Sequence, residues 1–138
     1  MVNRRVLLAK LAAIEHHLAR IREKRQVDIQ AFLKDLDRQE SILFNLQMAI
    51  QNCIDIAAHI VSEEEFGIPG STNELFYFLE ENGIIDPGLT EKMVHAVGFR
   101  NLIVHEYGKT DMEIVYRTAR DDIEDLREFM RNVAERFG

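Results

Sequence analysis

The feature that most constrains the fold is a broad apolar stripe of helical period between Leu36 and Glu64. Its members recur at helical spacings and are Ile42, Leu46, Ala49, Ile50, Cys53, Ile54, Ala57, Ile60 and Val61. A stripe this wide predicts one long, central and mostly buried helix, around which other helices pack. Cys53 lies on the stripe, and we expect it to be a buried, inert thiol.

Helix start and stop signals divide the rest of the chain. A first helix is predicted from about Asn3, a possible N-cap, to Lys24, and a short helix follows Asp28. After the central helix, a loop rich in glycine and proline precedes a further helix that Ser71 or Thr72 can cap.

The second half of the chain shows two more helical patterns. Asp86 and Pro87 predict a capped start for a helix that continues to about Tyr107, with Gly108 as its stop. Asp111 can cap a last helix. No segment has a convincing strand pattern, so we expect an all-α fold, an up-and-down bundle of four or five helices.

Length and composition agree with one such domain spanning residues 1–138. A single cysteine excludes an intrachain disulfide framework and favours the reducing cytoplasm. No apolar run approaches the roughly 20 residues that span a bilayer, so no membrane association is expected.

The net charge of −7 argues against tight, nonspecific nucleic-acid binding. Its distribution is uneven, because residues 1–25 hold seven basic and two acidic side chains, a net of +5. Either this basic first helix contacts a polyanion, or it is simply a solvated helix face.

Most motifs that carry chemistry are absent. The chain has no glycine-rich phosphate loop, no Cys/His cluster and no pair of histidines four residues apart, so neither a metal site nor a cofactor is expected. His105 differs from the other four histidines because Arg100, Asn101 and Tyr107 lie close to it in sequence.

On a continuous helix, Asn101 and His105 share one face, and Arg100 and Tyr107 share another. Arg100 and His105 point about 140° apart, so one helix does not easily direct both at a small target. Two copies related by a two-fold axis can do so, because each contributes one group to the other's site. The spacing is therefore compatible with a composite site in a homodimer.

An arginine and a histidine suit phosphodiester cleavage in RNA. A neutral imidazole can take the proton of the 2′-OH near pH 7, and arginine can hold the phosphate while charge builds on its oxygens. The requirement for RNA follows because DNA lacks this internal nucleophile.

The stretch Phe99-Arg100-Asn101-Leu102-Ile103-Val104-His105-Glu106-Tyr107 resembles the R-x4-H-x-Y signature of the HepT family of HEPN-domain toxins. Residues 46–60 resemble the central helix of that family, and residues 111–116 resemble the start of its last helix. The resemblance extends over nearly the whole chain.

The resemblance implies a homodimeric HEPN bundle that acts as the toxin of a type VII toxin–antitoxin system. It implies a metal-independent endoribonuclease with Arg100 and His105 as catalytic residues and Asn101 as their polar neighbour. The implied partner is a nucleotidyltransferase antitoxin that neutralises the toxin by AMPylation of Tyr107. A phosphate charge and a bulky base at that position would repel and block RNA.

The net negative charge of the chain is unfavourable for RNA binding. Candidate phosphate contacts are Arg100, Arg20, Arg22, Lys24, Arg25, Arg117 and Arg120. With so few cations, RNA binding is expected to be weak and sensitive to salt.

Two other functions remain open. One is a non-catalytic helical module that partners a nucleotidyltransferase, and the other is a purely structural dimerisation bundle. The presence of both Arg100 and His105 favours the nuclease, because a module without catalysis needs neither.

Overall fold

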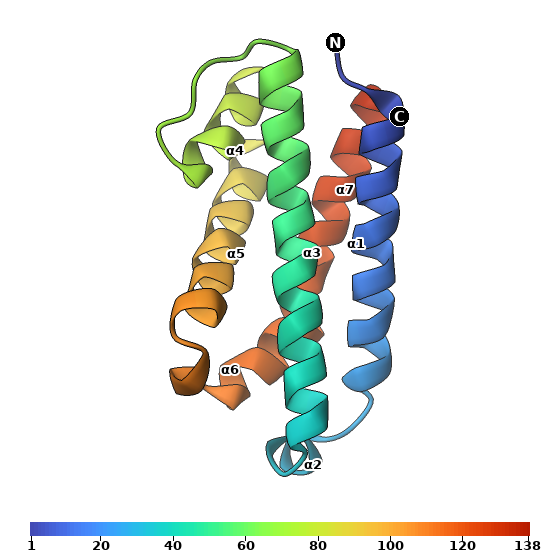
Figure 1. Cartoon of the computed structure of the whole chain (residues 1–138), viewed down its shortest axis with the longest axis vertical. Coiled ribbons are helices and arrows are strands. Elements are labelled where there is room, and N and C mark those ends of the chain that lie inside the picture. Colours follow the sequence, from blue (N-terminus) through green and yellow to red (C-terminus); the bar gives the residue numbers. More distant parts are fainter.

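The computed structural model, which describes residues 1–138, is built on two long antiparallel helices, α1 (Arg4–Lys24) and α3 (Leu36–Glu63) (Figure 1). Leu7, Ile14, Leu18 and Ile21 of α1 are buried, and they repeat with the three- and four-residue spacing of a heptad seam. The broad stripe of α3 meets this seam on one side and the remaining helices on the other. The predicted central helix is thus confirmed.

Polar contacts follow the edge of this seam at intervals of seven residues on α1. The Asn3 N–H donates to His59 Nε2 at 3.0 Å, Lys10 Nζ to Asp55 Oδ2 at 3.1 Å, and His17 Nδ1 to Asn45 Oδ1 at 2.8 Å. Residues that flank a helical seam commonly select register and orientation in this way. A shift of one turn between the helices would break all three contacts together.

The other elements complete an up-and-down bundle. They are α2 (Ile29–Leu33), α4 (Thr72–Glu81), α5 (Pro87–His105), the 3-10 turn η1 (Tyr107–Lys109), α6 (Met112–Arg117), the π turn η2 (Thr118–Asp122) and α7 (Ile123–Phe137). The long helices α1, α3, α5 and α7 alternate in direction, and both chain ends lie at the same end of the bundle (Figure 1). The all-α prediction is confirmed. None of the helices combines the length and hydropathy that crossing a bilayer requires.

Side-chain caps explain why the helix starts were predictable. Asn3, Asp28, Asp35, Ser71, Asp86 and Asp111 each accept a hydrogen bond from a backbone N–H in the first turn of the helix that follows. Of the two candidates for α4, the cap is Ser71. These bonds satisfy donors that a helix leaves free, and they need only neighbours in sequence.

The prediction for the end of α5 was wrong by two residues. The helix ends at His105, because Glu106 leaves the helical backbone region with φ −134° and ψ 39°. The Thr110 hydroxyl donates to the Glu106 carbonyl at 3.2 Å and closes a separate turn over Tyr107–Lys109. Tyr107 and Gly108 therefore lie in η1, and Gly108 is not the residue that stops the helix.

The predicted last helix is also interrupted. Between α6 and α7, the π turn η2 frees backbone carbonyls, and Arg25 Nη1 donates to two of them, those of Ala119 at 2.9 Å and Arg120 at 3.2 Å. A side chain inserted into the helical ladder is a recognised cause of a bend. The bend directs α6 away from the axis of α7, toward the end of the bundle that holds α2 (Figure 1).

The Cys53 side chain is fully buried on α3, as predicted, and burial raises the pKa of its thiol far above the ordinary value. We expect the folded protein to be inert to Ellman's reagent, because the reagent needs an accessible thiolate. Guanidinium-induced unfolding should release the full reaction, followed by absorbance. A Cys53→Ala, Ala58→Cys variant, with its thiol on the exposed side of α3, should react at once. Rapid labelling of the folded wild type would contradict the prediction.

The cap of α3 predicts a pH-dependent stability. The Arg38 backbone N–H donates to Asp35 Oδ1 at 3.1 Å. This hydrogen bond, together with the nearby Arg38 side chain, holds the pKa of the Asp35 carboxyl below its ordinary value of 3.8. A carboxyl whose pKa is lowered on folding adds stability above its unfolded pKa and loses it as pH falls through the folded pKa.

Urea unfolding of the wild type and of Asp35→Asn, which retains a capping oxygen, measures this effect. The wild type should be the more stable at about pH 7, and the difference should fade toward about pH 3. Glu40→Gln, farther along α3, serves as the control without such a trend. A difference that stays constant with pH would refute the assignment.

Candidate functional site

The motif residues lie at the end of α5, a helix that along its length packs on α3, α4 and α7. Val97, Phe99 and Ile103 are buried and hold the last turns of α5 against the core. Arg100 follows Phe99 directly and is half-buried, whereas Asn101 and His105 are exposed. The core therefore fixes the backbone of α5 and leaves the motif side chains at the surface.

Arg100 and Asn101 are brought together. Arg100 Nη1 donates to Asn101 Oδ1 at 3.1 Å, which orients the guanidinium group. The Arg100 Nε is buried and has no hydrogen-bond partner. A buried donor without a partner is costly and uncommon in folded proteins.

His105 lies in the last turn of α5, five residues after Arg100. The main cavities of the chain are lined by neither Arg100 nor His105. Because α5 is helical over both residues, the divergence of about 140° between them applies as predicted. One chain therefore does not gather the two side chains into a cleft.

Tyr107 differs from the other two tyrosines of the chain. The Tyr77 hydroxyl donates to Glu91, whose charge raises the pKa of Tyr77, and the Tyr116 hydroxyl donates to the Val27 carbonyl. The Tyr107 hydroxyl has no partner in the protein, and the residue is 51% exposed in η1. Since α5 ends before it, the prediction that Tyr107 shares a helix face with Arg100 was wrong.

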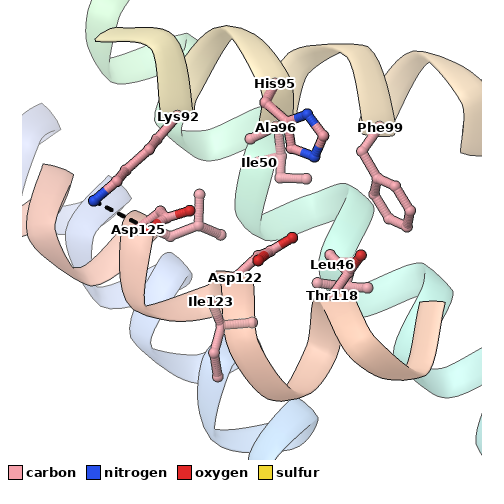
Figure 2. A pocket seen from close by; sticks show the side chains of 11 residues that line it. Leu46, Ile50, Lys92, His95, Ala96, Phe99, Thr118, Asp122, Ile123 and Asp125 are labelled. Atoms are coloured by element: carbon pink, nitrogen blue, oxygen red, sulfur yellow. Dashed lines mark ion pairs between the residues drawn. The ribbon is translucent and has the colours of Figure 1, made fainter. Parts of the chain in front are cut away.

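A small cavity separates α5 from η2 and α7 (Figure 2). His95 and Asp122 turn toward each other across it, and Lys92 Nζ lies 3.8 Å from Asp125 Oδ1. Burial raises the pKa of the Asp125 carboxyl. The volume of about 20 Å³ admits about one water molecule, so this cavity is a packing gap between the helices and is too small for a substrate. No group of three or more His, Cys, Asp or Glu side chains is placed to hold a metal ion.

Most of the cations proposed for RNA contact are bound within the chain. Ion pairs join Arg20 to Glu23, Arg22 to Glu15, Arg117 to Glu113 and Arg120 to Asp121, and the hydrogen bond from Arg120 lowers the pKa of the Asp121 carboxyl. Sequence reasoning missed Lys109, which makes no ion pair and ends the same turn that begins with Tyr107. Its place two residues after Tyr107 was the available signal.

Comparison with known proteins relates the chain to one protein family. The family described as Ribonuclease HepT-like matches residues 14–133. The chain is 33% identical to the mRNA nuclease HepT of Shewanella oneidensis over 91% of this chain and 93% of the relative. It is 27% identical to the tRNA nuclease HepT of Aphanizomenon flos-aquae, over 80% and 76% of the two chains.

A solved structure shares the fold closely. It is the tri-AMPylated HEPN toxin of Shewanella oneidensis in complex with an MNT antitoxin, with a TM-score of 0.87 and 32% identity. The likeness covers 94% of this chain and 97% of that one.

Proposed function

Because this chain belongs to the Ribonuclease HepT-like family, we propose that it is a toxin that cleaves RNA without a metal ion, at a site built by two copies of the chain. The observation that carries the proposal is the half-buried Arg100 guanidinium, which Asn101 orients through a hydrogen bond to Nη1. A phosphate oxygen is the acceptor that fits a planar, permanently charged donor group.

The dimer follows from the position of His105. Within one chain, this imidazole diverges from Arg100, whereas a two-fold axis near the end of α5 brings the Arg100 of one copy to the His105 of the other. The exposed apolar side chain of Val104, between the two motif residues, supports an interface there. Burying it against a second copy would remove apolar surface from water.

In the proposed reaction, the ribose 2′-OH attacks the adjacent phosphorus while one His105 takes its proton. The bond from phosphorus to the 5′ oxygen breaks, and a solvent water molecule gives the leaving oxygen its proton. Arg100 stabilises the charge that builds on the phosphate oxygens, and Asn101 positions the guanidinium. The products are a 2′,3′-cyclic phosphate and a 5′-hydroxyl end.

The proposed partner is a nucleotidyltransferase antitoxin that AMPylates Tyr107. Support comes from the free and exposed Tyr107 hydroxyl, and from the AMPylated state in which the similar Shewanella toxin is found with its MNT antitoxin. AMP at Tyr107, two residues beyond His105, places a negative charge and a base beside the path of the substrate phosphate.

Mixing two inactive variants tests the composite site. Arg100→Ala and His105→Ala should each lower the cleavage of an oligoribonucleotide by roughly 100- to 10,000-fold, measured in EDTA. After unfolding and refolding as a mixture, half of the dimers carry one intact Arg–His pair, so about a quarter of the wild-type activity should return.

The same mixture discriminates between the alternatives. A site within one chain gives no recovery, because each subunit lacks one of its two groups. A non-catalytic module or a purely structural bundle gives no cleavage even in the wild type. Loss of wild-type cleavage in EDTA would overturn metal independence.

Tyr107→Phe tests the switch. It removes only the hydroxyl that would accept AMP, so the variant should cleave RNA like the wild type and remain toxic when it is co-expressed with the antitoxin. Growth on induction and the mass of the purified toxin are the measurements. Full neutralisation of Tyr107→Phe by a catalytically active antitoxin would exclude Tyr107 as the site of control.

A further inference from the structure

A second, larger cavity lies where the end of α5 meets η1 and the start of α6. Its volume is about 160 Å³, on the order of ten times what one water molecule requires. Phe99, Leu102 and Ile114 form an apolar floor, and Glu106, Lys109 and Thr110 belong to the turn that borders it. A concave apolar floor with a few polar groups is the usual make-up of a site for a small organic ring.

The turn that borders the cavity is held by its own hydrogen bonds. The Lys109 N–H donates to the Glu106 carbonyl at 2.9 Å, and the Thr110 hydroxyl donates to the same oxygen at 3.2 Å. Asp111, also at the border, already uses its carboxylate to accept from the Glu113 N–H. The Glu106 carboxylate and the Lys109 ammonium have no partner in the chain, so one acceptor and one cation remain free at the rim.

The cavity adjoins the motif residues. Leu102 and His105 are three residues apart on α5 and share a face of the helix. Lys109 ends the turn that Tyr107 begins. A phosphate bound beside His105 therefore has the apolar floor one helical turn away, which is about the separation between a phosphate and a neighbouring base.

We propose that this cavity binds an unstacked nucleobase next to the scissile phosphate, and so determines base preference; the inference rests on the proposed ribonuclease function. The ring packs between Phe99, Leu102 and Ile114, and Lys109 contacts a flanking phosphate. The Glu106 carboxylate accepts from the exocyclic amine of adenine, cytosine or guanine. Uracil is disfavoured, because carbonyl oxygens flank its single ring N–H and face the carboxylate. The substrate is then single-stranded, since a paired base cannot enter.

Filling the cavity tests this assignment. Cleavage is measured on two kinds of oligoribonucleotide that differ only in one base beside the scissile phosphate. In one kind this base carries an exocyclic amine, and in the other it is uracil. The wild type should prefer an amino-bearing base by about tenfold or more at one flank. Ile114→Trp, at a side chain 48% exposed, should bring the two rates together. Leu8→Trp on α1, at a similar exposure of 42%, is the matched control and should keep the wild-type ratio.

Glu106→Gln examines the polar edge. A glutamine both donates and accepts, so this variant should cleave uracil-containing substrate relatively better than the wild type does. The ratio of rates within one variant is the readout, which cancels any general effect on the neighbouring His105. A wild type without base preference at either flank, or an Ile114→Trp protein with the wild-type ratio, would overturn the proposal.

A binding experiment separates this inference from the proposed function. Methyl NMR of Leu102 and Ile114 is recorded with a 2′-O-methyl oligonucleotide, which cannot be cleaved, and separately on AMPylated protein without RNA. Shifts with the oligonucleotide support a nucleobase of RNA as the ligand, even if the wild type fails to cleave RNA. Shifts only in the AMPylated protein assign the cavity to the adenine of AMP and overturn base selection. Cleavage of RNA without shifts in either sample refutes the cavity while the nuclease stands.

Discussion

The antiparallel packing of α1 on α3 is the constraint on which the rest of the structure depends. Its apolar seam supplies the burial, and the polar contacts at its edge, from Asn3, Lys10 and His17, select one register. The other faces of α3 pack against α5 and α7. The motif at the end of α5 is positioned by this chain of packing, because Val97, Phe99 and Ile103 anchor its last turns in the core.

The break at Glu106 divides the proposed chemistry from its proposed control. Up to His105 the backbone is helical, so the divergence of Arg100 and His105 is set by helix geometry and favours a two-chain site. Beyond it, Tyr107 belongs to a turn with its own hydrogen bonds and exposes its hydroxyl. The same turn forms one side of the apolar cavity, so the proposed catalytic residues, the proposed modification site and the proposed base site adjoin one another.

Charge is arranged along the length of the bundle. The acidic run from Glu63 to Glu65 follows the end of α3 that lies far from α6, and the basic end of α1 lies close to η2 (Figure 1). Most arginines near α6 are held in surface ion pairs, and such pairs contribute little stability. In the proposed nuclease, RNA phosphates would exchange for those carboxylates at small cost, and a net charge of −7 predicts binding that is weak and sensitive to salt.

The sequence by itself determined most of the helices and the positions at which they start. Caps such as Asp35 and Asp86 act on backbone within three residues, and the α3 stripe is a local periodicity, so neither needs a tertiary contact to be recognised. The R-x4-H spacing likewise predicted that the two motif side chains diverge. The tertiary structure alone decided the features that depend on distant partners. The π turn is held by Arg25, 94 residues from Ala119 in sequence, and the cavity at the end of α5 requires the fold to bring Ile114 of α6 to Phe99 and Leu102. A periodic pattern encodes which face of a helix is buried, whereas where a helix breaks and what it meets there depend on residues that only folding brings together.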